Sequence, residues 1–166
     1  MEKTRQNLAS VVLAVFDFDG VFTDNSVFVN EDGIESVRCF RSDGIGLKRI
    51  NDLNVKTLII SSEKSKLVQT RSEKLNIDCI SNVEHKDVVL RNYSKKNNIP
   101  LSKVLYLGND INDIDVLKIV GYPFVVRDSF NEVLEYACFQ TRNKGGYGAV
   151  REVCDYIFND KKNVNV

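Results

Sequence analysis

Two aspartates, Asp17 and Asp19, stand directly after an unbroken apolar run at residues 11–16. A short run of this kind, rich in β-branched residues, predicts a strand that is buried on both faces. Two carboxylates at the carboxyl end of such a strand would lie in the crevice where open α/β sheets bind ligands. Burying this much negative charge is costly unless a metal ion or another cation offsets it. The pair therefore indicates a chemical site rather than a contribution to stability.

Further polar features fall at the same predicted edge of the sheet. They are Ser61 and Ser62 after the run at 55–60, Lys86 at the start of a helical pattern, and the acidic loop 108–113 after the run at 104–107. Together they suit a phosphate-ester site, in which a carboxylate attacks phosphorus to form an acyl phosphate. Because that carboxylate would repel a phosphate dianion, a divalent cation is expected between them, and oxygen-rich ligands favour Mg²⁺.

The elements that must position these residues follow from hydrophobic periodicity. Apolar runs at 11–16, 55–60, 104–107 and 124–126 alternate with stretches of helical spacing. This alternation predicts an α/β fold, a Rossmann-like three-layer sandwich with a parallel central sheet. Ser129 and Glu132 have the spacing of a capping box, which predicts that a helix begins there.

One stretch interrupts the alternation. Val27, Val29, Val37 and Cys39 flank the turn residues 30–33, which predicts a β-hairpin inserted between the first two strands of the sheet. The hairpin is too short to be an independent domain, so no separate cap domain is expected. Its apolar side chains would be exposed unless something covers them, and oligomerisation is one way to do so.

Length and composition set outer limits. The 166 residues fit a single domain, 1–166, with flexible ends expected at 1–10 and 159–166. The 23 basic and 23 acidic side chains balance, so neither nucleic acid nor a membrane is expected as a partner. The polar start and short apolar run match no signal peptide, and the four scattered cysteines have no metal-binding spacing. We therefore expect a cytoplasmic protein with reduced thiols.

The polar segments resemble, in order, the four motifs of the haloacid dehalogenase superfamily: Asp17-Phe18-Asp19-Gly20-Val21, Ser61, Lys86 and Gly108-Asn109-Asp110-Ile111-Asn112-Asp113. Segments 41–46 and 144–152 are similar to those of its capless sugar-acid phosphatases. That group includes phosphatases for 3-deoxy-D-manno-octulosonate 8-phosphate and for nine-carbon ulosonic acid 9-phosphates. The resemblance covers about residues 11–158 and implies a Mg²⁺-dependent phosphomonoesterase that forms a homotetramer through the hairpin.

The resemblance also implies a role for each matching residue. Asp17 would be the nucleophile that forms an aspartyl phosphate, and Asp19 would be the general acid and base. Ser61 would hydrogen-bond the oxygens of the transferred phosphoryl group, and Lys86 would neutralise their charge.

The implied metal site departs from the family pattern at one position. Asp17 and the backbone carbonyl of Asp19 match the metal ligands of the family, but the metal-binding aspartate after the glycine of the last motif is replaced by Asn109. An asparagine still offers a carbonyl oxygen while removing one negative charge. Magnesium binding would then be weaker, or Asp110 would serve instead. Asp113 would orient the ligands or Lys86 from behind them.

The residues after Ser61 bear on the substrate. Relatives for the eight-carbon acid carry Gly-Arg there, whereas this chain has Ser62 and Glu63, with Arg71 and Lys74 further along the helix. That pattern is similar to phosphatases for 2-keto-3-deoxynononate 9-phosphate, where Glu63 would accept an extra hydroxyl and a cation would bind the carboxylate. The eight-carbon ester is the alternative substrate, and the three charged side chains could also merely stabilise an exposed helix.

Two further expectations concern the end of the chain and the class of protein. The resemblance implies that the glycine-rich loop 145–148 closes over a neighbouring subunit's active site, which would give Arg151 a role in substrate binding. The plainer interpretation is a flexible connection to the last helix. A catalytically silent oligomerisation module is the rival class, and the substitution at Asn109 is its only support.

Overall fold

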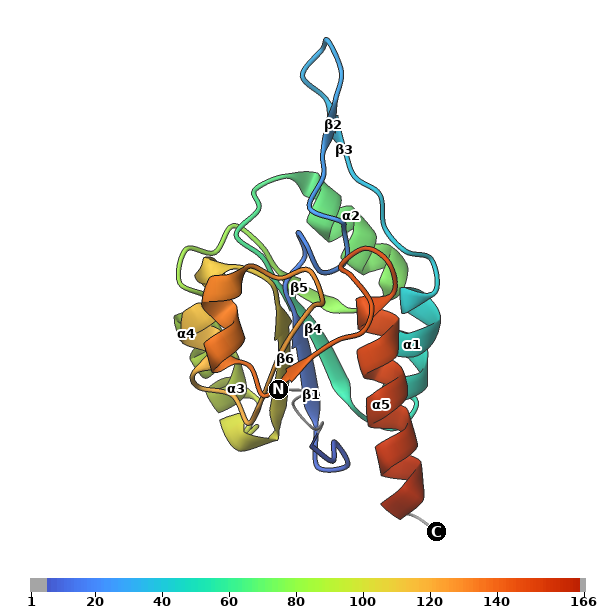
Figure 1. Ribbon diagram of the computed structural model, residues 1–166, viewed down its shortest axis with the longest axis vertical. Coiled ribbons are helices and arrows are strands. Elements are labelled where there is room, and N and C mark those ends of the chain that lie inside the picture. The colour runs from blue at the N-terminus through green and yellow to red at the C-terminus, as the bar shows by residue number, and fades with distance from the viewer. Residues whose placement is uncertain (1–5, 165–166) are drawn as a thin grey trace.

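The computed structural model describes residues 6–164 and is built around one parallel sheet (Figure 1). The six strands lie in the order β5-β4-β1-β6-β7-β8, and every neighbouring pair is parallel. These strands are β1 (Leu13–Phe16), β4 (Lys56–Ile60), β5 (Asp78–Ile80), β6 (Val104–Gly108), β7 (Tyr122–Val125) and β8 (Phe139–Gln140). The helices are α1 (Asp43–Asn51), α2 (Lys66–Leu75), α3 (Lys86–Lys96), α4 (Ile114–Leu117) and α5 (Ala149–Val164).

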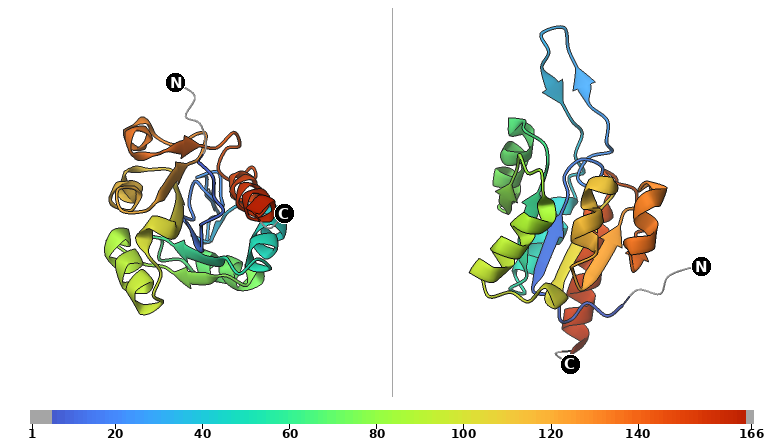
Figure 2. Two further views of the ribbon diagram at one scale, coloured as in Figure 1. Left: turned by 90° about the horizontal axis from the view of Figure 1, so that it is seen from below. Right: turned by 90° about the vertical axis from the view of Figure 1, so that its left-hand side faces the viewer.

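Side chains of the central strand β1 alternate between two cores. Ala14 and Phe16 pack into one cluster with residues of α1, α2 and α5, whereas Leu13 and Val15 pack into another with residues of α3 and α4. This period of two, with both faces apolar, is the reason that β1 is fully buried. The result is a three-layer α/β sandwich with helices on both faces of the sheet, as predicted (Figure 2).

The predicted alternation of strands and helices is correct for the central strands of the sheet but misses its two edge strands. β5 and β8 were not expected, because each is short and only partly buried and so lacks a continuous apolar run. The capping box predicted at Ser129 and Glu132 is wrong. A short 3₁₀ helix, η3 (Asn131–Tyr136), follows Phe130 instead, and the Ser129 hydroxyl is buried without a hydrogen-bond partner.

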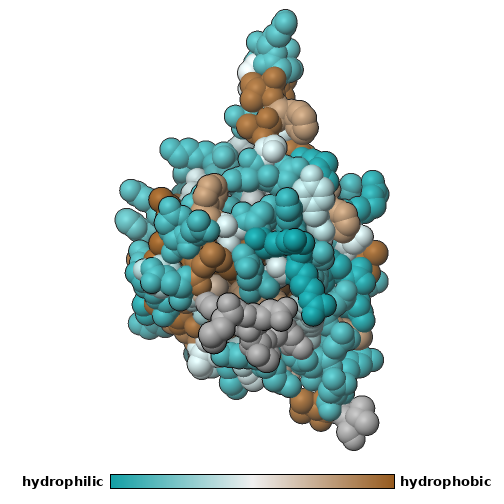
Figure 3. All heavy atoms as spheres, in the orientation of Figure 1, coloured by the Kyte–Doolittle hydropathy of each residue, from teal (hydrophilic) through white to brown (hydrophobic). Residues whose placement is uncertain are grey.

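The inserted hairpin is present and stands away from the body of the molecule (Figures 1 and 2). It pairs β2 (Phe28–Val29) with β3 (Glu35–Ser36) in antiparallel register. Its large apolar side chains are mostly in solvent: Phe28 is 65% exposed, Val29 61% and Ile34 64%. The space-filling view shows these apolar residues gathered on the projection (Figure 3).

Both terminal segments, which we expected to be flexible, are packed in part. Leu8 is fully buried and its backbone N–H donates to the Asp160 carboxylate at 2.7 Å. The Lys161 ammonium donates to the carbonyl of Ala9 at 2.8 Å, and α5 continues to Val164. The expectation therefore does not hold for residues 8–9 and 159–164, because the two segments supply each other's partners. Residues 1–5 and 165–166 lie outside the described part.

A further property of the helices is their length and apolar character. Within residues 6–164, none of the helices combines the length and the apolar character needed to cross a bilayer.

Candidate active site

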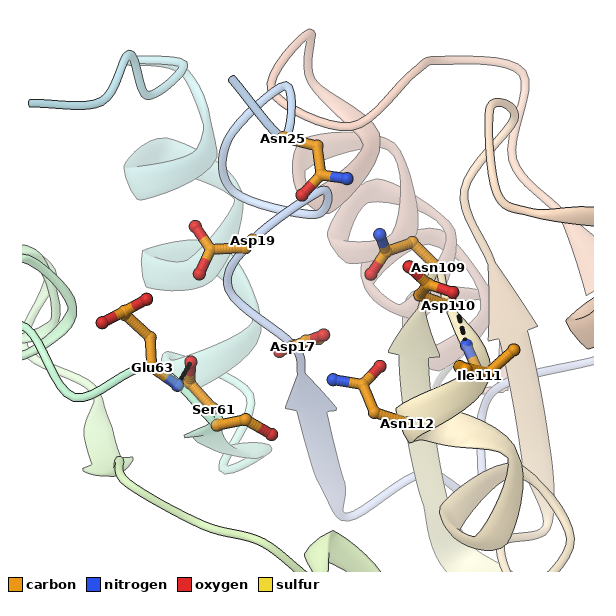
Figure 4. Close-up of a pocket in the computed structure, with 10 residues that line it drawn as sticks. Asp17, Asp19, Asn25, Ser61, Glu63, Asn109, Asp110, Ile111 and Asn112 are labelled. Carbon is orange, nitrogen blue, oxygen red and sulfur yellow. Dashed lines mark hydrogen bonds between the residues drawn. The ribbon is translucent and has the colours of Figure 1, made fainter. Parts of the chain in front are cut away.

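A cavity of about 270 Å³ opens where β1, β4 and β6 end (Figure 4). Parallel strands end at the same edge of a sheet, so the residues that follow them meet there. The lining residues are Asp17, Asp19, Asn25, Ser61, Ser62, Glu63, Asn109, Asp110, Ile111 and Asn112. The structure thus brings together the first, second and last groups of polar residues expected from the sequence. We call this cavity the carboxylate pocket.

Lys86 lies buried beneath the carboxylate pocket rather than in its wall. Its ammonium is 2.8 Å from an Asp17 carboxylate oxygen and 2.8 Å from an Asp113 carboxylate oxygen. Asp113 also accepts a hydrogen bond from the Tyr106 hydroxyl at 2.5 Å and one from the Asn109 backbone N–H at 2.8 Å. Asp113 therefore holds Lys86, and with it Asp17, from the side away from solvent.

The charges of this network do not balance, since two carboxylates face one ammonium. Burial, and then Asp113, raise the pKa of Asp17 to about 7, although Lys86 acts in the opposite direction. Burial alone would lower the pKa of Lys86, but Asp17 and Asp113 outweigh it and the pKa is raised. Lys86 is therefore held in its charged form, whereas the charged form of Asp17, on the floor of the pocket, is disfavoured unless a further cation is present.

The glycine of the first motif lets two loops approach each other. Gly20 has φ +79°, and a Cβ atom there would lie 2.1 Å from the Asn109 side-chain nitrogen. A side chain at this position would push apart the loops that carry Asp19 and Asn109. The Gly20 N–H donates to the Thr23 hydroxyl at 3.1 Å, which fixes the turn after Asp19.

The donor set of the pocket fits a divalent cation. Asn109 is only 5% exposed, and its side-chain oxygen is buried without a hydrogen-bond partner. An unpartnered buried carbonyl oxygen beside the Asp17 carboxylate is a ready ligand for a hard cation. Within the described chain no three Asp, Glu, His or Cys side chains are grouped as a metal site. The Asn109 amide oxygen, and the Asp19 backbone carbonyl that the family pattern implies, would then complete the ligand set with Asp17 or Asp110.

The second wall of the pocket is held by hydrogen bonds to the backbone. The Ser61 hydroxyl oxygen accepts the N–H of Glu63 at 3.1 Å, so its proton is directed elsewhere. One Glu63 carboxylate oxygen accepts the N–H groups of Lys64 and Ser65, both at 2.7 Å. Burial, and then Glu63, raise the pKa of Asp19. Ser61 and Glu63 are therefore oriented before any ligand binds.

Three residues expected to contact substrate lie outside the carboxylate pocket. Arg71 and Lys74 line a separate cavity of about 180 Å³, and Arg71 donates to the carbonyl of Phe40 at 3.2 Å. Arg151 faces its own helix, where its side chain pairs with Asp155 at 2.8 Å. Within one chain, therefore, Arg151 does not reach the pocket, because the phase of α5 directs it towards the contact with α1.

Sequence reasoning missed three residues near the site. Asn25 and Asn112 line the carboxylate pocket, and Tyr106 supports it through Asp113. Asn25 lies in a loop without periodicity and gave no signal, whereas Asn112 lies within the quoted acidic loop. Tyr106 could have been noticed, because a phenol in the middle of a buried strand needs a polar partner at one end.

Comparisons with known proteins agree with this geometry. The family model of the haloacid dehalogenase-like hydrolases matches residues 47–153. The 3-deoxy-D-manno-octulosonate 8-phosphate phosphatase KdsC of Yersinia pestis is 32% identical over 154 residues, which cover 92% of this chain and 82% of that protein.

Two solved structures share the fold over nearly the whole chain. A probable YrbI family phosphatase from Pseudomonas syringae pv. phaseolica 1448a has a TM-score of 0.92 and 36% identity, covering 96% of this chain and 92% of that one. The 3-deoxy-D-manno-octulosonate 8-phosphate phosphatase of Moraxella catarrhalis, solved with magnesium, phosphate and KDO, has a TM-score of 0.91 and 28% identity over the same shares, 96% and 92%.

Proposed function

The chain belongs to the haloacid dehalogenase-like hydrolases, and on that premise we propose that it is a Mg²⁺-dependent phosphatase of a 2-keto-3-deoxy sugar-acid phosphate. The observation that carries the proposal is the buried contact of Asp17 with Lys86 beneath a pocket of oxygen ligands. The names of the similar proteins supply the substrate class, since KdsC of Yersinia pestis and the Moraxella structure are phosphatases of such an ester.

In this proposal the reaction proceeds in two displacements. A carboxylate oxygen of Asp17 attacks phosphorus, the bond from phosphorus to the sugar oxygen breaks, and Asp19 gives its proton to the leaving alkoxide. Asp19 then takes a proton from a water molecule that attacks the same phosphorus. This second step breaks the bond between phosphorus and Asp17 and releases inorganic phosphate. The raised pKa of Asp19 suits a group that must hold a proton before the first step.

The remaining residues position the phosphoryl group. The Ser61 hydroxyl, whose oxygen already accepts the Glu63 N–H, is free to donate its proton to a phosphoryl oxygen. Lys86 keeps the Asp17 carboxylate in place and offsets its charge. Asp17, Asp19 and Asn109, with Asp110 as the alternative, would hold Mg²⁺, which when bound offsets the negative charges of substrate and nucleophile.

The finer proposal is a nine-carbon 9-phosphate ester as the preferred substrate. Glu63 lines the carboxylate pocket with a fixed carboxylate that can accept a sugar hydroxyl, and Arg71 and Lys74 line a cavity further along α2. The eight-carbon ester, 3-deoxy-D-manno-octulosonate 8-phosphate, is the alternative, and the named activity of KdsC favours it.

A further part of the proposal is assembly into a homotetramer through the hairpin. Phe28, Val29 and Ile34 are more than half exposed on a two-stranded projection that has no other element against it to cover them in the described chain. Contiguous apolar surface of this kind is a common site of subunit contact, and other copies of the chain would cover it.

The experiment is a comparison of specificity constants. Phosphate release from the 8-phosphate and 9-phosphate esters is measured with and without Mg²⁺, for wild type and Glu63→Arg. We expect Mg²⁺-dependent hydrolysis, with a ratio of kcat/KM that favours the nine-carbon ester in wild type and shifts towards the eight-carbon ester in the variant.

The matched control is Glu73→Arg, which makes the same charge change on an exposed face of α2. No hydrolysis of any ester would favour the silent oligomerisation module. An unchanged ratio in Glu63→Arg would remove the argument for the nine-carbon substrate while leaving the phosphatase itself in place.

A further inference from the structure

A second cavity, of about 280 Å³, adjoins the carboxylate pocket. The two share Asp19, Asn25 and Glu63 as lining residues, so a molecule with its phosphate over Asp17 can extend from one into the other. Part of the second cavity's wall comes from the hairpin, through Glu35 and Val37. Neither residue belongs to the motifs that indicated the catalytic site.

The segment that follows β3 explains how the hairpin contributes this wall. In extended chain, alternate side chains point to opposite sides. Glu35 and Val37 line the second cavity, and Cys39 and Arg41 line the third, in which Arg71 and Lys74 also lie. Segment 35–41 therefore lines the second cavity at its start and the separate third cavity at its end.

Arg38 and Phe40 anchor the segment. The Arg38 guanidinium pairs with Asp24 at 2.9 Å and stacks on the Tyr147 ring at 4.1 Å. The Phe40 ring lies against Gly148, where a Cβ atom would be 3.0 Å from it. Segment 35–41 is thus fixed against the glycine-rich loop, while Glu35 lines the second cavity.

Helix α2 supplies the opposite wall of both cavities. Leu67 lines the second cavity, and Arg71 and Lys74 line the third, at intervals of four and three residues that share one face of a helix. Arg71 also donates to the Phe40 carbonyl, which ties α2 to segment 35–41. Figure 1 shows this stretch of chain running from the hairpin past α2 to α1. The second and third cavities share no lining residue, so we give the name leaving-group groove to the second cavity alone.

The leaving-group groove is lined by carboxylates. Glu35 comes from the hairpin and Glu63 from the segment before α2, and Asp19 lies where the groove adjoins the carboxylate pocket. Carboxylates repel an anionic group and accept hydrogen bonds from hydroxyls.

We propose that Glu35 is a further specificity-determining residue, which accepts hydroxyls of the leaving group. This inference rests on the proposed function and deepens it. The hairpin stem then contributes to substrate binding within one chain, because Glu35 and Val37 form part of the wall of the leaving-group groove. A substrate with its phosphate over Asp17 and hydroxyls along its length matches this arrangement.

One variant and three esters test the proposal. The esters are the nine-carbon acid 9-phosphate, glucitol 6-phosphate, which has the hydroxyls but no carboxylate, and p-nitrophenyl phosphate, which has neither. Glu35→Gln should lower kcat/KM for the first two about tenfold more than for the third, mainly through KM.

The control makes the same change at an exposed position away from the groove. Glu31→Gln lies at the tip of the hairpin. Equal kinetics for Glu35→Gln and Glu31→Gln would overturn the role of Glu35. A loss that accompanies a fall in molar mass by light scattering would also overturn the proposal, since Glu35 would then act at a subunit contact. If wild type hydrolyses no ester, the proposed function fails first.

Discussion

The carboxylate pocket and the hairpin differ in which side chains they bury and which they expose. Under the pocket, Lys86, Asp113 and Tyr106 are all buried and supply one another's partners from three different elements. On the hairpin, Phe28 and Val29 belong to a two-residue strand and lie mostly in solvent. The difference teaches that this chain buries charge where its own fold provides the counter-groups, whereas on the hairpin it leaves apolar side chains exposed to solvent.

The largest expected effect is the loss of catalysis in a variant that keeps its fold. Asp17→Asn should lower kcat at least about 10³-fold, because an amide oxygen cannot replace the attacking carboxylate. Lys86 retains Asp113 as a partner at 2.8 Å, so the buried ammonium is not left alone. Phosphate release gives kcat, and thermal unfolding checks the fold.

Asp115→Asn is the matched control, since this aspartate is exposed on α4. Turnover by Asp17→Asn close to that of the control would refute the nucleophilic role. Loss of the folded state in Asp17→Asn would instead show that Asp113 alone cannot offset the buried charge of Lys86. The buried network would then depend on the catalytic carboxylate for its stability.

The sequence was sufficient where burial leaves few choices. Asp17, Ser61 and Asn109 meet because each follows a central strand, and central parallel strands must be apolar and must end at one edge. The hairpin was also predictable from its turn residues. These features depend on local pattern together with one general rule about parallel sheets.

Features that depend on the phase or the packing of an element could not be predicted. Arg151 pairs with Asp155 because of the direction in which α5 packs on α1, which no motif encodes. The helix predicted at Ser129 is displaced since the N–H of Phe130 donates to the carbonyl of Asn109 at 2.9 Å. Glu35 escaped notice because its place in the groove depends on how the hairpin packs beside α2, which no local pattern encodes.

The second prediction concerns the junction between the two regions, where Asp43 opens α1. Asp43 is fully buried, and one of its carboxylate oxygens has no hydrogen-bond partner. Burial raises its pKa to about 7, although the Arg151 N–H and Arg71 act in the opposite direction. Since the unfolded chain titrates near its ordinary value of 3.8, the folded state binds more protons between about pH 4 and pH 7. Asp43 therefore makes the fold less stable as pH rises through that window.

Asp43→Asn removes this titration, so the variant should be more stable than wild type. The difference in unfolding free energy should grow between pH 4.5 and pH 8 to about 2–4 kcal/mol. Denaturant unfolding at several pH values measures the free energy of unfolding of both proteins. Subtracting the wild-type value at each pH cancels the pH dependence that the other titratable groups contribute to both. Asp52→Asn, an exposed position at the end of the same helix, is the control. A difference between Asp43→Asn and wild type that does not change with pH would contradict the expectation.

A third change sharpens the account of charge in the pocket. Asn109→Asp should lower the Mg²⁺ concentration for half-maximal activity about tenfold, because the unpartnered amide oxygen becomes a charged ligand. Asn112→Asp adds the same charge elsewhere in the pocket lining. This control distinguishes direct coordination of Mg²⁺ by residue 109 from a general increase in negative charge around the pocket. An equal shift in both variants, or none in Asn109→Asp, would direct the search for the metal ligand to Asp110.

The smallest effect on chemistry is expected from the hairpin itself. Phe28→Ser removes a largely exposed aromatic side chain that does not line the carboxylate pocket. If other copies of the chain cover it, each lost contact costs about 1.5–3 kcal/mol of association free energy, and the molar mass by light scattering should fall. Turnover of p-nitrophenyl phosphate should change less than threefold, because every partner of Asp17 and Lys86 comes from the body of the same chain.

Val88→Ser is the matched control for Phe28→Ser, since Val88 is an exposed apolar residue on α3. An unchanged molar mass in Phe28→Ser would mean that the apolar hairpin surface does not hold copies together. A fall in molar mass together with a large loss of p-nitrophenyl phosphate turnover would also contradict the comparison. The catalytic centre would then depend on a neighbouring subunit rather than on one chain alone. Only dissociation with retained turnover supports both halves of the comparison, a chemistry complete within one chain and an assembly built on its projection.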